Sequence, residues 1–303
     1  MDHMTAVTFE QVTKRYGDVR AVDALTLDLL PGETVALLGP NGAGKSSTLD
    51  LLLGLRQPDS GSVRVFGTSP RDAITAGRVG AMLQSGGLMG EVTVRELVRL
   101  ACDLHPRPHR VSDVLAHAGV TQLAERRVDK LSGGQEQRVR FALATAGAND
   151  LIVLDEPTTG MDVTVRQAFW ATMREQADQG RTVLFATHYL EEADAIADRV
   201  LVLHRGRLIA DGTAAEIKAK AGARRVSFDL ADIDEAGARA LRALPFLAAL
   251  DVSGHTVRLQ STDADATVHA LYGLGLYPRN LEVTGLGLEQ AFVAITEAEE
   301  ARA

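Results

Sequence analysis

The chain has 303 residues, 46% of them hydrophobic, which suffices for one large domain or two ordinary ones with a sizeable core. Its formal net charge of −8 disfavours a protein whose main task is to hold nucleic acid, because such proteins usually need a basic face. The single cysteine, Cys102, excludes an internal disulfide and a cysteine-based zinc cluster, which favours a reducing compartment.

The first third of the chain predicts strands and a phosphate-binding loop. Alternating apolar positions at residues 6–9 and 25–29 predict antiparallel edge strands. An apolar strand at 34–38 leads into GPNGAGKS at 39–46, and a helix-like stretch follows at 47–55. The octapeptide matches G-x-x-x-x-G-K-[ST] in the strand–loop–helix setting that gives this pattern its meaning.

This loop has the chemistry of a nucleotide site. Its glycines let successive backbone N–H groups point into one concavity, and the helix that follows adds the positive end of its dipole. Lys45 can reach the β and γ phosphates, and the Ser46 hydroxyl can ligate Mg²⁺. The predicted nucleotide-binding residues here are Gly39, Pro40, Asn41, Gly42, Ala43, Gly44, Lys45, Ser46 and Ser47.

The middle of the chain predicts a helical insertion. Strands are expected at 62–66 and 79–83, the second ending at Gln84. Apolar residues at helical spacing follow at 92–104 and 112–125. Strands alternating with helices then resume, which favours a largely parallel sheet covered on both faces. These expected elements are strands at 151–154, 182–186 and 200–204 and helices at 165–179 and 190–197.

Two acids follow the strand at 151–154. Asp155 is expected at the carboxyl edge of the sheet, where ligands of parallel α/β proteins bind, and it is suited to hold Mg²⁺ directly or through water. Glu156 faces another direction and is placed to orient or deprotonate a water that attacks the γ phosphate.

The pattern of predicted elements changes after Gly222. Strands and helices are expected in the order β-α-β-β-α-β over residues 225–284, the order of a split βαβ unit, and a closing helix is expected at 288–299. A domain boundary is therefore predicted near 219–223.

The segment LSGGQ at 131–135 makes a resemblance specific. A phosphate loop, then LSGGQ, then an apolar strand ending in Asp-Glu resembles the ATP-binding cassette of ABC transporters over roughly residues 7–212. The resemblance implies an α/β phosphate-loop NTPase with a RecA-like core, an antiparallel β edge and a helical subdomain at about 85–145. The expected domains are a nucleotide-binding domain at 4–218 and a small α+β C-terminal domain at 223–303.

The same resemblance implies roles for residues outside the loop. Tyr16 matches the aromatic residue that stacks on adenine. Gln84 matches the loop glutamine that serves catalysis and the metal and couples nucleotide to the membrane partner. Residues 157–162 match the loop that crosses the dimer interface, and His188 matches the switch histidine that senses the γ phosphate.

A dimer follows from the place of LSGGQ. The helical insertion separates this segment from the phosphate loop of its own chain, and the family resolves this with a head-to-tail pair. ATP held by Lys45 of one copy is then closed in trans by Ser132, Gly133, Gly134 and Gln135 of the other. The expected partners are a second copy and integral membrane permease subunits, with no nucleic acid.

The subgroup resemblance is to drug-export ATPases of the daunorubicin-resistance type, in which ATPase and permease are separate chains. It rests on residues 157–162, on THYLEEAD at 187–194 and on the C-terminal appendage. It implies a cytoplasmic protein that lies on the inner face of the membrane through its permease. Glu136 departs from the family, where a basic residue or Met is frequent, and residues 85–90 lack the usual Pro and aromatic residues.

Two other classes compete with this interpretation. One is a soluble cassette ATPase that acts on nucleic acid or the ribosome, although such proteins usually carry two cassettes or long coiled-coil inserts. The other is a phosphate-loop kinase with a small acceptor, in which LSGGQ would have no role.

Overall fold

The computed structural model describes residues 5–84, 86–220, 222, 224–230 and 235–301. The chain separates into two compact units, Met1–Thr213 and Ala214–Ala303. The domain limits expected from the sequence, 4–218 and 223–303, differ from this division by the length of one helix, and residues 4, 223 and 303 lie outside the described residues. Those limits stay a prediction, as does the helical subdomain at about 85–145, whose first residue is also outside the described part.

The N-terminal edge is a three-stranded antiparallel sheet. Strands β1 (Val7–Tyr16), β2 (Val19–Leu29) and β4 (Ser60–Val65) pair in the order β2-β1-β4. Both β1 and β2 are longer than their apolar alternation predicts, because the β1–β2 pairing continues past register shifts after Phe9, where Gln11 has a φ of 49°. The bulge breaks the alternation that the prediction used.

The second sheet of this unit has six strands and carries the candidate site. Its order is β5-β6-β7-β3-β8-β9, with β9 antiparallel to its neighbour and the other pairs parallel. Each residue of β3, β6 and β7 is buried, which explains their continuous apolar runs. The strands are β3 (Thr34–Leu38), β5 (Val79–Met82), β6 (Leu151–Asp155), β7 (Thr182–Ala186), β8 (Arg199–His204) and β9 (Arg207–Gly212).

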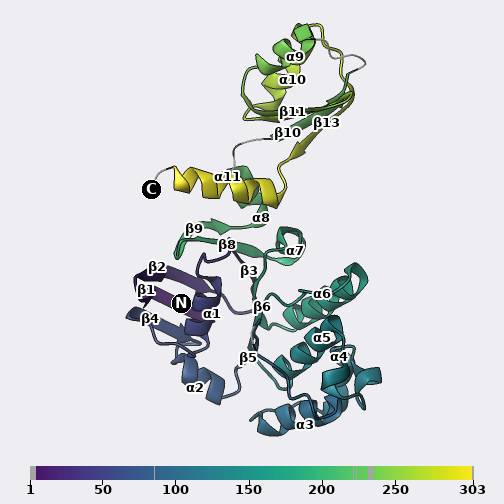
Figure 1. Cartoon of the computed structure of the whole chain (residues 1–303). Coiled ribbons are helices and arrows are strands. Elements are labelled where there is room, and N and C mark those ends of the chain that lie inside the picture. Colours follow the sequence, from purple (N-terminus) through teal and green to yellow (C-terminus); the bar gives the residue numbers. More distant parts are fainter. Residues whose placement is uncertain (1–4, 85, 221, 223, 231–234, 302–303) are drawn as a thin grey trace. The chain divides into compact units, whose positions relative to one another are not determined.

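Helices cover both faces of this sheet (Figure 1). Helix α1 (Lys45–Leu52) contributes Leu49, Leu51 and Leu52 to one core that also holds side chains of the antiparallel sheet. On the other face, α6 (Val163–Asp178) packs through Phe169 and Trp170, and the Trp170 ring lies 4.7 Å from that of Phe185 in β7. Two short helices lie in connections between strands: α2 (Pro70–Thr75) between β4 and β5, and α7 (Leu190–Ile196) between β7 and β8.

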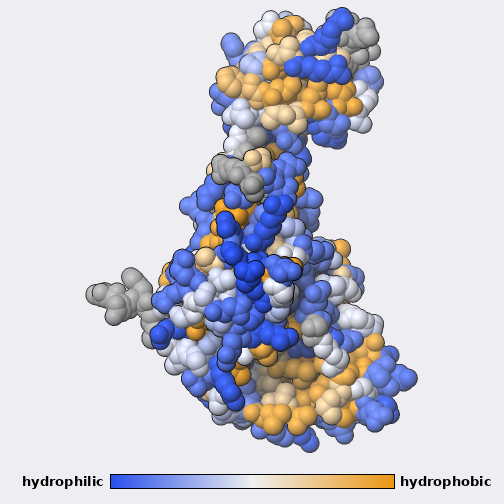
Figure 2. All heavy atoms as spheres, turned by 60° about the vertical axis from the view of Figure 1, so that its left-hand side comes forward, coloured by the Kyte–Doolittle hydropathy of each residue, from blue (hydrophilic) through white to orange (hydrophobic). Residues whose placement is uncertain are grey.

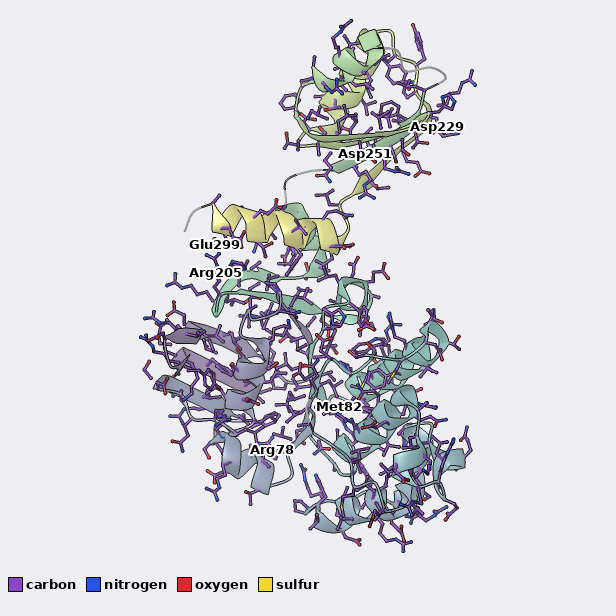
Figure 3. All side chains as sticks on the ribbon, in the orientation of Figure 1. Arg78, Met82, Arg205, Asp229, Asp251 and Glu299 are labelled. Carbon is purple, nitrogen blue, oxygen red and sulfur yellow. The ribbon has the colours of Figure 1, made fainter. Side chains whose placement is uncertain are left out.

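Three helices lie together at the lower right of Figure 1: α3 (Val94–Leu104), α4 (Val111–His117) and α5 (Gly133–Ala144). The expected helix at 112–125 is wrong beyond His117. Gly119 has a φ of +64°, which ends the helix, and only a 3₁₀ turn at Thr121–Leu123 follows. β5 leads into this region, with Arg78 before its start and Met82 at its end (Figure 3).

The second unit is a four-stranded antiparallel sheet with two helices in the split βαβ order. Its sheet order is β11-β12-β10-β13, and Val226, Phe228, Leu259 and Leu271 form part of its core. Its elements are α8 (Ala214–Lys220), β10 (Arg224–Asp229), α9 (Glu235–Arg242), β11 (Leu247–Ser253), β12 (Thr256–Ser261), α10 (Ala264–Gly273), β13 (Arg279–Gly285) and α11 (Leu288–Glu300). The predicted fold class, an α/β cassette plus a small α+β domain, is confirmed.

No helix among the described residues has both the length and the hydropathy that a bilayer span requires. The surface is mixed in polarity (Figure 2). The same view shows an apolar hollow in the lower part of the Met1–Thr213 unit.

Candidate functional site

The loop between β3 and α1 has a backbone that only glycine permits at two positions. A Cβ on Gly39 would lie 2.6 Å from the carbonyl oxygen of Leu203. Gly44 has a φ of +104°, and a Cβ there would lie 2.2 Å from the carbonyl oxygen of Ala21. The glycines therefore let the loop pack closely against β8 and the antiparallel sheet. The next residue after Gly44 is Lys45, the first of α1.

Lys45, that first residue, folds back over the loop. Its Nζ donates to the carbonyl oxygens of Gly39 at 2.6 Å and Pro40 at 3.3 Å, and the side chain is buried. Burial lowers the pKa of Lys45, while the carboxylates of Glu156 and Asp155 oppose that shift. A buried cation whose hydrogen bonds go to backbone carbonyls is poised to bind an anion in the loop.

Ser46 and Asp155 meet across the end of the sheet. The Ser46 hydroxyl donates to Asp155 Oδ2 at 3.3 Å, joining the start of α1 to the last residue of β6. Burial and the neighbouring Glu156 carboxylate raise the pKa of Asp155, against the lowering effects of Ser46 and Lys45. A hydroxyl and a carboxylate oxygen at one point are hard donors of the kind that divalent cations prefer.

Glu156 and His188 form the second polar pair. His188 Nδ1 lies 2.6 Å from Glu156 Oε2, although the two residues are 32 positions apart. They meet because β6 and β7 are adjacent parallel strands in which Asp155 is the register partner of Ala186. Glu156 is buried and has a φ of 51°, a conformation that is strained for a residue with a side chain and is typical of functional sites.

An open cleft of about 540 Å³ unites these groups. Most of the residues expected to bind the nucleotide line this cleft. Gly39 is not among the lining residues, but its carbonyl oxygen accepts a hydrogen bond from Lys45, which is. Val19 and Ala21 of β2 also line it, and the sequence reasoning missed both because alternation in a hairpin strand carries no signal of ligand contact. The lining residues are Val19, Ala21, Pro40, Asn41, Gly42, Ala43, Gly44, Lys45, Ser46, Ser47, Gln84, Asp155, Glu156 and His188.

Two expected groups lie outside the cleft lining. Tyr16 is at the end of β1, 41% exposed, and is the register partner of Val19, so it stands next to the cleft wall without forming part of it. The segment from Ser132 to Gln135 begins α5, where Ser132 Oγ accepts from the Gln135 backbone N–H at 3.4 Å and Gln135 Oε1 accepts from the Ser132 N–H at 3.1 Å. Within one chain these residues do not meet the phosphate loop.

The unusual Glu136 belongs to a contact with the loop at Gln84. Its carboxylate accepts from Arg140 Nη2 at 2.7 Å, one turn along α5. Arg140 Nη1 also donates to the carbonyl oxygens of Leu83 and Gln84, at 3.4 and 3.3 Å. The start of α5 is thus tied to the backbone of the glutamine loop, and nothing in the spacing of these residues along the chain indicated it.

The chain is similar to known proteins over most of its length. Residues 22–159 match the family model of the ABC transporter domain. The chain is 35% identical to Nod factor export ATP-binding protein I of Paraburkholderia xenovorans (strain LB400), over 88% of each chain. It is 33% identical to daunorubicin resistance ATP-binding protein DrrA3 of Streptomyces coeruleorubidus, over 96% of each.

Solved structures agree with these relatives. The ATP-binding subunit of an ABC transporter superposes with a TM-score of 0.66 at 28% identity, covering 72% of this chain and 94% of that one. A dimeric ATP-binding cassette in a post-hydrolysis state, bound to ADP and phosphate, gives 0.63 at 25% identity, covering 68% and 98%. A bacterial Atm1-family exporter with ATP bound gives 0.64 at 26% identity, covering 73% and 41%.

Proposed function

The chain belongs to the ABC transporter family, as an ATP-hydrolysing subunit of the exporter type, and we propose that it drives a separate membrane permease by closing and opening a dimer around ATP. The observation that carries this proposal is the convergence of Lys45, the Ser46–Asp155 pair and the Glu156–His188 pair on one cleft behind a phosphate-binding loop. The alternative of a cassette that acts on nucleic acid or the ribosome gains no support from the relatives.

The loop binds the phosphates of ATP in this proposal. Backbone N–H groups of residues 40–47 cradle the phosphates, and the dipole of α1 adds to their field. Lys45 leaves the carbonyls of Gly39 and Pro40 to pair with the β and γ phosphates. Tyr16, beside the cleft wall, stacks on the adenine.

Mg²⁺ fits the donors at the end of the sheet. The Ser46 hydroxyl and the Asp155 carboxylate would hold it, with Gln84, which lines the same cleft, as a further ligand. The raised pKa of Asp155 marks a buried carboxylate short of positive charge, which a divalent cation would supply. When bound, the ion offsets the negative charge of the phosphates.

Hydrolysis requires a base and a sensor for the γ phosphate. Glu156, a buried carboxylate that lines the cleft, orients a water and accepts its proton. His188, 52% exposed on its side chain, donates to the γ phosphate while its other ring nitrogen faces Glu156. Loss of the γ phosphate then removes contacts from both residues and from Lys45.

The second copy closes the site. Ser132, Gly133, Gly134 and Gln135 lie at the start of α5, where free N–H groups and the helix dipole favour an anion, and within one chain they do not line the cleft. Shifting the population from about 1:99 to 99:1 closed takes about 5.5 kcal/mol of differential affinity. Several hydrogen bonds to charged groups, at roughly 1.5–3 kcal/mol each, supply that amount.

The permease places the protein at the membrane. We infer that this chain lies on the cytoplasmic face of the cell membrane through permease subunits that dock near the Gln84 loop. The support is the exporter role of the relatives and the exposed apolar side chains in the stretch of chain that follows Gln84, namely Met89 and, in α3, Leu100 and Leu104. The C-terminal α+β domain serves in this proposal as a dimer-stabilising addition.

The proposal is tested with the purified chain and Mg–ATP in the absence of any acceptor. Steady phosphate release is expected, and it should disappear in Lys45→Ala. ADP that forms only when a small acceptor is added, with the phosphate recovered on that acceptor and none released, would indicate a kinase instead. A second test isolates the chain from detergent-solubilised membranes: a co-purifying integral membrane protein supports export, whereas ribosomal or nucleic-acid partners contradict it.

A further inference from the structure

Glu192 of α7 is a buried carboxylate that the steps above do not use. It is 5% exposed and accepts hydrogen bonds from two hydroxyls, Thr158 Oγ1 at 2.6 Å and Thr187 Oγ1 at 3.3 Å. Arg166 of α6 lies close as a looser ion pair, with its Nε 3.4 Å from Glu192 Oε1. Burying a carboxylate costs free energy of folding unless hydrogen bonds and a cation compensate its charge. The bonds of Glu192 should therefore hold its three partners firmly together.

The two hydroxyls come from the segments that carry the catalytic pair. Thr158 lies two residues after Glu156, and Thr187 directly precedes His188. Both threonines are fully buried. Thr187 Oγ1 also accepts from the Tyr189 backbone N–H at 3.0 Å, so the same hydroxyl orients the turn that holds His188. One carboxylate therefore bonds to the segments that follow both strands, and neither Glu192 nor the two threonines line the cleft.

A stack of side chains adds a second link from Arg166 to the switch histidine. The Arg166 guanidinium lies 4.4 Å from the centre of the Tyr189 ring, and that ring lies 4.1 Å from the ring of His188. Arg166 thus faces Glu192 on one side and Tyr189 on the other. The half-exposed His188 ring is therefore held by the half-buried Tyr189 ring as well as by Glu156.

We propose that Glu192 is a positioning residue for ATP hydrolysis: it clamps the segment after Glu156 to the segment before His188 and so sets the distance between these two groups. The inference rests on the proposed function. The clamped segment, residues 157–162, is also the one expected to cross the dimer interface, so Glu192 links arrival of the second copy to the placement of His188.

This role separates chemistry from binding. Among the described residues, the hydrogen bonds and ion pair of Glu192 go to Thr158, Thr187 and Arg166 and not to Lys45 or the loop between β3 and α1, so ATP affinity should depend little on it. Loss of the clamp should instead misplace Glu156 relative to the γ phosphate, and a misplacement of about 1 Å can cost on the order of a hundredfold in rate. The signature of the clamp is a fall in kcat with little change in the dissociation constant for ATP.

The test compares Glu192→Ala, Glu192→Gln and Thr158→Val with the control Glu191→Gln, which removes the adjacent, exposed acid of the same helix. We expect kcat of Glu192→Ala to fall roughly ten- to a hundredfold, with the ATP dissociation constant, measured in the Glu156→Gln background, within about twofold. Glu192→Gln keeps an acceptor and should recover part of the rate. Adding Thr158→Val to Glu192→Ala should cost nothing more, because both remove the same bond.

Wild-type kcat in Glu192→Ala overturns the proposal, and so does a loss that is additive with Thr158→Val. Should Glu192→Ala fail to fold, the isosteric variants Thr158→Val and Thr187→Val carry the test, and each should lower kcat at unchanged ATP affinity. Slow hydrolysis by Glu156→Gln alongside normal Glu192 and Thr158 variants would refute the clamp alone, whereas normal hydrolysis by Glu156→Gln would refute the proposed function beneath it.

Discussion

His188 Nδ1 lies 2.6 Å from Glu156 Oε2 at the carboxyl ends of two adjacent parallel strands. The contact couples a buried carboxylate to a histidine whose side chain is half exposed, and both residues line the cleft. Parallel pairing of β6 with β7 makes this meeting unavoidable, since each of these two residues follows the end of its own strand by one or two positions.

Glu156→Gln is expected to bind ATP normally and to hydrolyse it at least about a hundredfold more slowly, because an amide cannot accept the proton of the attacking water. Gln preserves the size of the side chain and its capacity to bond with His188. The measurement is single-turnover phosphate release at saturating ATP. A rate equal to that of the wild type would remove Glu156 from the mechanism.

Lys45→Ala is expected to weaken ATP binding about tenfold or more, because the buried ammonium is the cation nearest the loop that cradles the phosphates. Calorimetric titration with a non-hydrolysable ATP analogue gives the dissociation constant. Arg71→Ala is the matched control, because Arg71 is an exposed cation of α2 outside the cleft lining. Equal affinity in the Lys45 variant and this control would contradict the site.

Asp155→Asn is expected to stabilise the nucleotide-free chain while abolishing hydrolysis. The pKa of Asp155 is raised above 3.8, first by burial and then by Glu156, so the folded chain holds the proton more tightly than the unfolded chain. The ionised carboxylate therefore costs stability as pH rises through the folded-state pKa. Asn removes that cost, and the gain should vanish as pH falls toward 3.8.

The measurement for Asp155→Asn is the melting temperature of the nucleotide-free chain from pH 3.8 to neutral pH. A rise of a few degrees is expected near neutral pH. A lower melting temperature than the wild type at neutral pH would show instead that the hydrogen bond from Ser46 and the charge attraction of Lys45 outweigh the burial of Asp155.

Arg140→Met is expected to lower turnover several-fold, because the guanidinium is the link between α5 and the backbone of Leu83 and Gln84. Glu136→Gln should have a smaller effect, since it weakens only the 2.7 Å bond within α5. Both rates follow from phosphate release under steady-state conditions. A larger loss in the Glu136 variant would place the importance of this pair within the helix rather than at the glutamine loop.

Local patterns predicted the parts of the site that are local in the chain. The phosphate loop and the acids after β6 each lie within a few residues of a buried strand, and the glycines at 39 and 44 are required by the close approach of other backbone. The wall formed by Val19 and Ala21 could not be predicted, because it depends on how β2 folds over the loop.

Side-chain contacts between residues far apart in the chain likewise could not be predicted from the sequence. Thr158 and Glu192 are 34 positions apart, and Arg140 is 56 positions from Gln84, so no periodicity joins them. Strand β9 was missed because its sequence, RLIADG, does not alternate between apolar and polar residues; the strand forms through its antiparallel pairing with β8. Helices α2 and α8 are too short for a periodic signal.

Closure of two copies around ATP is tested most directly by the molar mass in solution of the Glu156→Gln chain with saturating Mg–ATP. We expect a mass twice that of one chain in ATP and that of one chain in ADP, because Ser132 of each copy must complete the site of the other. A chain that binds ATP stoichiometrically and keeps the mass of one copy would contradict it.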